Sequence, residues 1–293
     1  MILSAFCLIT NPIRNQYPVI ESIKSVLPIV DELVVVDGWS DDGTVEAIKA
    51  LQDDRIRIIK DEDTRWPEEW TYWRMGHNFS RGFNECRGDF AMKFDVDYIF
   101  DDEYEFRMDC EYAAKEVLTI SFERKNFMLV DRHFTKRPKT LAVNKKLCKE
   151  RKIDARWGYD LKNWGMCDEA IIYEKTKDKL LQGRLLSLES IRRVTPTQPN
   201  NYAYVFRTEE VGKDLMFRNM RAFYRQQNFK IPTKEKVWEE YIMACLKEFS
   251  GKKHTRIKLE DHPTFAKDLI KNLKPNQQGY NFWGKKVTAD YYL

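Results

Sequence analysis

The first hundred residues alternate between strand-like and helix-like segments, and this order restricts the chain to few folds. Four apolar runs have the composition of buried strands: residues 2–9, 33–36, 55–60 and 90–94. Apolar residues at helical spacing separate these runs: residues 19–27, 44–51 and about 68–86. A β-α-β order of this kind predicts an α/β fold, with a mostly parallel twisted sheet and helices on both faces.

The second half of the chain is less regular. Further strands are predicted at residues 117–122, 127–131, 140–144 and 201–207, with basic turns between the first three. Helices are predicted at residues 209–227, 233–249 and 263–273. We therefore expect a catalytic domain over residues 1–207 and a helical C-terminal extension over residues 208–293, packed on that domain.

The overall composition is that of a globular protein. Hydrophobic residues make up 43% of the 293 residues and charged residues 33%, while the net charge is only +4. The total charge therefore indicates no strong polyelectrolyte partner, although basic residues cluster in one stretch: Lys136, Arg137, Lys139, Lys145, Lys146, Lys149, Arg151 and Lys152. Such a cluster is more often a solvated face than a binding site for an anionic partner.

The six cysteines and the apolar segments bear on the compartment. No Cys-x-x-Cys pair occurs, so we expect free thiols rather than a zinc site or a disulfide framework. The apolar start, residues 1–9, is too short to cross a bilayer and follows no basic segment, and no other run approaches a transmembrane length. These features predict a cytoplasmic protein.

Acidic loops follow three of the four predicted strands. Asp37 follows the second strand, Asp61 and Asp63 follow the third, and Asp95 and Asp97 follow the fourth. Because ligands of such sheets bind at the carboxyl ends of the strands, these acids are expected along one binding edge.

Asp95 and Asp97 form the pair with the clearest chemistry. An extended backbone places side chains two residues apart on one side, where two carboxylates repel unless a cation or a donor neutralises them. Mn²⁺ or Mg²⁺ would do so and leave coordination positions for phosphate oxygens. The Asp-x-Asp pattern also occurs in ordinary surface loops, but its place after an apolar strand favours the metal.

Several segments together resemble a known family. The stretch YPVIESIKSVLP at residues 17–28 is followed by DELVVVDGWSDDGT at residues 31–44, and Gly88-Asp89-Phe90 leads into Asp95-Val96-Asp97. In this combination, residues 2–103 resemble family 2 glycosyltransferases with the GT-A fold, which move a sugar from a nucleoside diphosphate sugar.

The resemblance implies roles for the residues at the binding edge. Thr10 is expected near the base, Asp37 and the turn from Ser40 to Thr44 near the nucleoside, and Asp61 or Asp63 at the edge of a pyrimidine base. Asp95 is expected near the ribose or in the outer shell of the metal. Asp97 is expected to ligate the metal and so to reach the diphosphate.

Inverting transfer requires a general base that takes the proton of the acceptor hydroxyl. In the family this base lies well downstream of the metal motif. Two segments there contain a Trp-Gly pair followed by acidic residues: residues 157–160 and 164–169. We favour Asp168 over Asp160 and Glu169; the alternative is that these acids only cap the following element. For the remaining cationic and metal contacts, Arg207 is the candidate for the diphosphate, and His262 is the best histidine for the metal.

These features predict a metal-dependent, inverting hexosyl- or pentosyltransferase acting on a glycan or a small-molecule acceptor. A nucleic acid acceptor is the second choice. A sugar nucleotidyltransferase is less consistent with the sequence, since residues 10–16 contain no glycine for a phosphate loop. A non-catalytic nucleic-acid-binding protein would use the basic residues 136–152. It would also need aromatic side chains for base stacking among them, but the stretch has no aromatic residue until Trp157.

Overall fold

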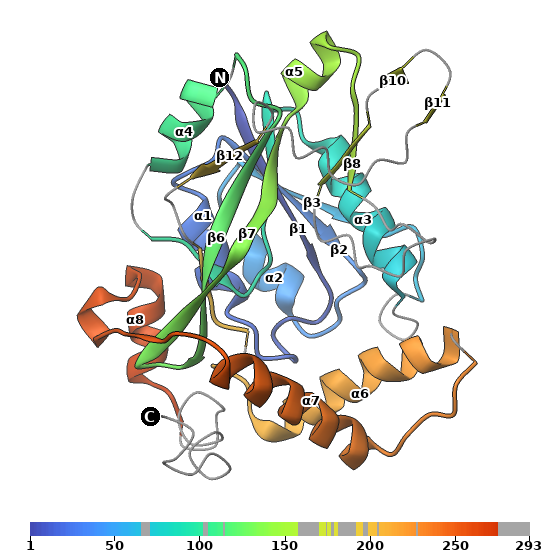
Figure 1. Ribbon diagram of the computed structural model, residues 1–293, viewed down its shortest axis with the longest axis vertical. Coiled ribbons are helices and arrows are strands. Elements are labelled where there is room, and N and C mark those ends of the chain that lie inside the picture. Colours follow the sequence, from blue (N-terminus) through green and yellow to red (C-terminus); the bar gives the residue numbers. More distant parts are fainter. Residues whose placement is uncertain are drawn as a thin grey trace.

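The computed structural model shows an α/β fold over most of the chain (Figure 1). The described residues are 1–65, 71–101, 105–113, 115–157, 170–173, 175–176, 179–180, 192–195, 199–203, 205–226 and 228–274. Within these ranges, no helix combines the length and the apolar character needed to cross a bilayer. The cysteines that they include are buried free thiols, as predicted: Cys7, Cys86, Cys110, Cys148 and Cys245.

Four parallel strands form the first half of the main sheet. They are β1 (Leu3–Ile9), β2 (Glu32–Asp37), β3 (Ile56–Lys60) and β4 (Phe90–Lys93). Their spatial order is β3-β2-β1-β4, and each neighbouring pair is parallel. Gly88 allows β4 to approach β1, because a Cβ at this position would lie 2.7 Å from the carbonyl oxygen of Ile2. The predicted α/β class is confirmed.

Helices cover both faces of these strands. They are α1 (Val19–Val26), α2 (Thr44–Lys49), α3 (Tyr72–Glu85), α4 (Glu105–Ala113) and α5 (Lys145–Glu150). Successive side chains of β1 point to opposite faces of the sheet. Leu3 and Cys7 join a core cluster that includes α1, α2 and α4, whereas Phe6 packs with Phe83 of α3 in a second cluster. Burial on both faces explains why β1 is an almost continuous apolar run.

A long antiparallel hairpin replaces the three short strands predicted after residue 116. β6 (Thr119–Leu129) pairs with β7 (Arg132–Asn144), and β7 pairs antiparallel with β4. The predicted basic turns are therefore wrong, because these basic residues lie within the hairpin strands. Three register shifts interrupt the pairing, and each shift breaks the two-residue alternation from which a strand is recognised in the sequence.

Shorter strands complete the sheets. β5 (Tyr98–Ile99), β12 (Arg192–Thr195), β13 (Asn200–Asn201) and β14 (Thr255–Arg256) join the main sheet. Two separate pairs are β8 (Asp154–Trp157) with β9 (Ala170–Tyr173), and β10 (Lys175–Thr176) with β11 (Lys179–Leu180). The strand predicted at residues 201–207 is wrong beyond β13. The amide of Val205 donates to the carbonyl of Tyr202, so the chain turns there instead of extending.

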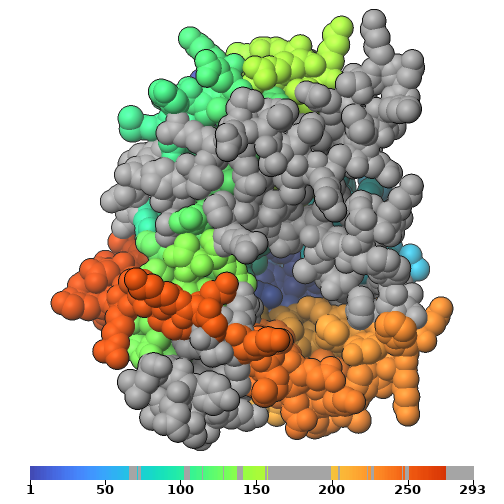
Figure 2. All heavy atoms as spheres, viewed as in Figure 1, coloured from blue at the N-terminus to red at the C-terminus, as the bar shows by residue number. Residues whose placement is uncertain are grey.

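The last described part of the chain is helical, as predicted. It contains α6 (Glu209–Gln226), α7 (Lys234–Ser250), the 3₁₀ turn η1 (Leu259–Asp261) and α8 (Thr264–Lys271). α6 and α7 pack against each other, and α8 packs on α1. In Figures 1 and 2, α6 (orange) lies at one end of the molecule and α5 (yellow-green) lies at the other.

Candidate functional site

Two loops at the carboxyl edge of the sheet are tied together by hydrogen bonds. The amide of Asn11 donates to Oγ of Ser40 at 3.0 Å, and the amide of Asp41 donates to Oδ1 of Asn11 at 2.8 Å. Gly43 turns the chain into α2 with a φ of +84°, a conformation that favours glycine. The predicted turn thus exists, and its Ser40 hydroxyl holds the loop that follows β1.

Asp37 lies at the end of β2 with a fully buried side chain. One carboxylate oxygen accepts the amide of Ser40 at 2.9 Å, and the other is buried without a hydrogen-bond partner among the described residues. Burial raises the pKa of this carboxyl group, against the opposing effect of Ser40. A buried acceptor without a partner costs free energy, so this oxygen suits a donor from a ligand.

Asp61 and Asp63 follow β3 but differ in their partners. Asp61 is buried and accepts the side-chain amide of Asn78, from α3, at 2.8 Å. Asp63 forms ion pairs with Arg65 and Arg74, and the hydrogen bonds from Arg65 lower its pKa to about 2. Since Asp63 already has two cationic partners, Asp61 is the better placed of the two to accept a hydrogen bond from a base.

Asp95 and Asp97 lie directly after β4, as the sequence predicts. The Lys93 ammonium group is 2.7 Å from Oδ1 of Asp95. In contrast, Oδ1 of Asp97 is buried and has no hydrogen-bond partner in the part of the chain that the structure describes. Burial and the neighbouring charge of Asp95 raise the pKa of Asp97 to about 7. The two acids are thus close enough to repel each other, which is the condition that a bound cation relieves.

The acid pair fits a hard divalent cation. Among the described residues, no group of three His, Cys, Asp or Glu side chains is arranged to hold a metal ion. Mg²⁺ commonly binds through one or two carboxylates, with phosphate oxygens and water completing its coordination. The partnerless oxygen of Asp97 and the adjacent carboxylate of Asp95 match this donor set.

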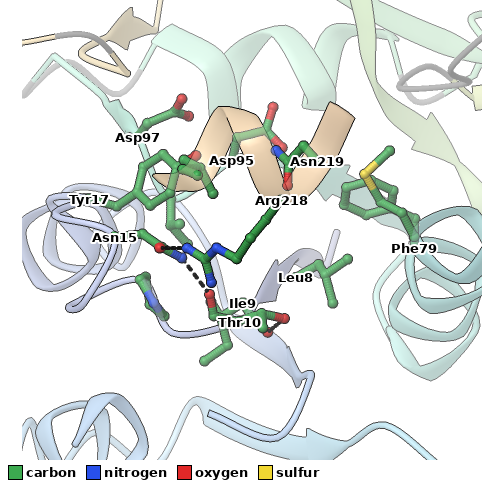
Figure 3. Close-up of a pocket in the computed structure, with 14 residues that line it drawn as sticks. Leu8, Ile9, Thr10, Asn15, Tyr17, Phe79, Asp95, Asp97, Arg218 and Asn219 are labelled. Carbon is green, nitrogen blue, oxygen red and sulfur yellow. Dashed lines mark hydrogen bonds between the residues drawn. The ribbon is translucent and has the colours of Figure 1, made fainter. Parts of the chain in front are cut away.

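A cavity of about 250 Å³ opens beside the acid pair (Figure 3). Its walls come from the end of β1, the following loop, α3, the acid pair and α6. The lining residues are Leu8, Ile9, Thr10, Pro12, Asn15, Tyr17, Met75, Phe79, Asp95, Val96, Asp97, Leu215, Arg218 and Asn219. Of the predicted site residues, the cavity brings together Thr10, Asp95 and Asp97.

Arg218 provides a cation at this cavity, and the sequence analysis did not identify it. Figure 3 shows Arg218 reaching from α6 to Asn15, to whose Oδ1 it donates at 2.7 Å. Burial lowers the pKa of Arg218, as expected for a guanidinium group that has lost part of its water. Arg218 lies 121 positions after Asp97 on a helix with several other basic residues, so the sequence carried no signal to select it.

Arg207, the predicted diphosphate contact, lies behind the cavity wall. Its side chain is buried, and the guanidinium group lies 4.5 Å from the centre of the Tyr17 ring. Its Nε donates to the carbonyl oxygen of Asn15 at 3.1 Å. Arg207 therefore supports the loop that carries Asn15 and Tyr17.

His262 lies in a separate aromatic cluster with Phe127 and Tyr202. Its Nε2 is 2.8 Å from the carbonyl oxygen of Val130, and its Nδ1 is 2.8 Å from the Tyr202 hydroxyl. A carbonyl only accepts, so Nε2 carries the proton and Nδ1 accepts from Tyr202. Neither nitrogen has a lone pair left for a metal, and the structure does not bring His262 into the cavity with Asp97.

The three candidate bases, Asp160, Asp168 and Glu169, lie outside the described residues. The basic stretch is described in part. Lys146, Lys149, Arg151 and Lys152 are exposed on or beside α5, next to the start of β4, whereas Asp97 follows the end of β4. The exposed basic side chains are thus at the opposite end of the sheet from the cavity.

Comparison with known proteins gives a family match. Residues 12–154 match the model of the family described as glycosyl transferase family 2. No sequence among the curated proteins matches the chain.

Three solved structures illustrate what the fold is similar to. The mannosyltransferase PcManGT from Pyrobaculum calidifontis, solved with GDP-Man and Mn²⁺, is 12% identical with a TM-score of 0.46, over 99% of this chain and 81% of that chain. TarS from S. aureus, solved with UDP, is 14% identical with a TM-score of 0.44, over 89% and 77%. Glucosyl-3-phosphoglycerate synthase from Mycobacterium tuberculosis, solved with Mn²⁺, UDP and phosphoglyceric acid, is 18% identical with a TM-score of 0.31, over 41% and 42%.

Proposed function

We propose, on the premise that residues 12–154 form a glycosyltransferase family 2 domain, that the protein transfers a sugar from a nucleoside diphosphate sugar to an acceptor hydroxyl. The transfer inverts the anomeric configuration and depends on Mn²⁺ or Mg²⁺. The acceptor is a glycan or a small molecule, and the transferred group is a hexose or a pentose.

The observation that carries this proposal is the partnerless buried oxygen of Asp97 at the wall of the cavity. Asp97 and Asp95 would hold the divalent cation, which neutralises the diphosphate and stabilises the leaving nucleotide when bound. Arg218 faces the same cavity and adds a charged donor for phosphate oxygens. An acid pair and a guanidinium group around one small cavity suit a ligand with a metal-bound diphosphate.

The nucleoside would bind next to this cavity, toward β2 and β3. Asp37 offers a buried oxygen without a partner, and Asp61 a buried carboxylate beside Asn78. Thr10 lines the cavity between these acids and the metal pair. Asp37 would accept a hydroxyl or imino hydrogen of the nucleoside, and Asp61 would accept from a pyrimidine edge. Ser40 would hold the loop that follows β1 through its bond to Asn11, and Asp63 would hold the loop that follows β3 through its ion pair with Arg74.

For the acceptor half of the reaction we retain Asp168 as the base, with Asp160 and Glu169 as alternatives. A carboxylate within hydrogen-bond reach of the acceptor hydroxyl would take its proton as the anomeric carbon is attacked. The exposed basic residues at α5 lie at the other end of the sheet from the cavity, so these residues do not favour a nucleic acid as the acceptor.

A donor panel tests the proposal. UDP-, GDP-, CDP- and dTDP-sugars are incubated with the protein in Mn²⁺, in Mg²⁺ and in EDTA, and the released nucleotide is measured. We expect one donor to be hydrolysed slowly without an acceptor, and Asp97→Ala to abolish this release. Absence of binding for every nucleotide sugar, or full turnover by Asp97→Ala, would contradict the proposed function.

A further inference from the structure

β4 carries a lysine at a position where a buried apolar residue would be expected. Lys93 is the last residue of β4 and pairs in register with Phe6 of β1, and its side chain is fully buried. The other residues of β4 are apolar and buried: Phe90, Ala91 and Met92. Lysine is almost never fully buried unless it has a partner, because the loss of hydration around an ammonium group is expensive.

The partners of Lys93 connect it to the acid pair. Its Nζ lies 2.7 Å from Oδ1 of Asp95 and 4.5 Å from the ring centre of Phe79. Both Asp95 and Phe79 line the cavity, whereas Lys93 does not reach its surface. The ammonium group therefore lies directly behind the cavity wall. It cannot contact a ligand there, but its charge acts on one.

We propose that Lys93 is a fixed cation that lowers the dependence of donor binding on the divalent metal. This inference rests on the proposed function. Lys93 holds Asp95 in place and neutralises one of the two carboxylates that face the diphosphate. A nucleoside diphosphate then meets an acid pair whose negative charge is partly compensated by the ammonium group, and it binds weakly even when no metal is present.

The same charge has an opposite effect on the metal. A divalent cation that approaches Asp95 and Asp97 is attracted by both carboxylates and repelled by the ammonium group beside them. Lys93 therefore weakens the binding of the free metal ion while it strengthens the metal-free binding of the diphosphate. A purely structural lysine would change stability without these two opposite effects.

Lys93→Met separates the two effects, because methionine has a similar length and no charge. By isothermal titration with Mn²⁺ alone, we expect the variant to bind Mn²⁺ at least about tenfold more tightly than the wild type, a change equivalent to one unit of log K. By titration with a nucleoside diphosphate in EDTA, we expect at least about tenfold weaker binding. Lys93→Arg, which keeps the charge, should restore both wild-type values.

Lys145 provides a matched control. It is also a lysine over a phenylalanine ring, with Nζ 4.9 Å from the Phe83 ring centre and 2.7 Å from the Phe83 carbonyl oxygen. It caps the end of α3 at the other end of the sheet. Lys145→Met should change thermal stability and leave the affinities for Mn²⁺ and the diphosphate unchanged.

The outcomes distinguish the inference from the proposed function. If the wild type binds a nucleoside diphosphate in Mn²⁺ but Lys93→Met has wild-type affinities, Lys93 is structural and only the inference fails. If the wild type binds neither Mn²⁺ nor any nucleoside diphosphate, the proposed function fails as well. If Lys93→Met does not fold, Lys93→Gln, which also removes the charge but keeps a polar end, is titrated in its place with the same expected results.

Discussion

The carboxyl edge of β1 to β4 and the segment from residue 199 to residue 274 both contribute to the region around the cavity, but in different ways. At the strand edge, Asp37, Asp61 and Asp97 each follow the end of a strand, so strand order alone brings them to one side of the sheet. Among the described residues of the later segment, Leu215, Arg218 and Asn219 line the cavity. The comparison shows that strand order collects the acids at one edge of the sheet, whereas a residue of the later segment such as Arg218 reaches the cavity only through tertiary packing.

The two candidate metal ligands, Asp97 and His262, differ in whether an atom is left for a ligand. Asp97 has a buried oxygen without a partner, whereas both nitrogens of His262 are already used by Val130 and Tyr202. The first belongs to the strand edge and the second to the packed C-terminal segment. Four pairs of variants test whether this division between ligand-binding and structural residues holds.

The largest effect is expected for Asp97→Asn. Loss of the carboxylate should lower turnover by roughly 10²–10³-fold or more, because a charge-stabilising group of the site is removed. The thermal stability of the metal-free protein should stay the same or increase, since a buried carboxylate close to Asp95 is neutralised. Steady-state kinetics and calorimetric melting measure the two changes. His262→Gln should lower the melting temperature and leave turnover unchanged, because it removes the contacts with Tyr202 and Val130. An equal loss of turnover in the two variants would contradict the contrast.

Arg218→Met should show that the C-terminal helix contributes to the donor site. A charge-assisted hydrogen bond contributes about 1.5–3 kcal/mol, so the affinity for a nucleoside diphosphate should fall roughly 10- to 100-fold. The affinity for the corresponding nucleoside should not change, since it has no phosphate. Titration calorimetry with both ligands measures this difference. Arg225→Met, at an exposed position of the same helix, is the control, and equal losses in both variants would assign the effect to general charge.

Asp37→Asn should weaken binding of the nucleoside itself by about tenfold, the size expected for one hydrogen bond to a charged acceptor. Asp42→Asn is the control at the same turn, because Asp42 accepts from the Arg14 amide and from Thr44. It should lower the melting temperature without changing nucleoside affinity. If Asp42→Asn weakened binding as much as Asp37→Asn, the whole turn rather than Asp37 would be responsible.

The smallest effect is a pH dependence at His133 of β7, which pairs with β14 of the C-terminal segment. Burial, with Lys125, His262 and His254 nearby, lowers the pKa of His133 to about 4 from an unfolded value near 6.5. Between these values the unfolded chain binds more protons, so stability falls as the pH falls from about 6.5 to 4. His133→Leu should reduce the loss in melting temperature between pH 7 and pH 5 by a few degrees. His77→Gln, at an exposed position, should leave the loss unchanged, and an unchanged loss in His133→Leu would contradict the assignment.

Where local pattern and tertiary contacts agree, the structure confirms the sequence-based predictions. β1 is predicted because both of its faces are buried, and α6, α7 and α8 because their apolar residues recur at helical spacing. The hairpin β6–β7 was missed because its register shifts interrupt the alternation that marks a strand. The strand predicted at residues 201–207 failed because the chain turns at Tyr202, whose amide donates to the carbonyl oxygen of Asp97.

The sequence by itself determined the α/β class and the positions of Asp37, Asp61, Asp95 and Asp97, because apolar runs mark the strands and each acid follows one of them. Only the tertiary structure decided which polar atoms remain without partners. It formed the ion pair between Arg74 and Asp63 and placed Lys93 behind Asp95. It also brought Arg218, and not Arg207, to the wall of the cavity. These pairings join residues from different elements, and whether a charge is satisfied depends on its neighbours in space.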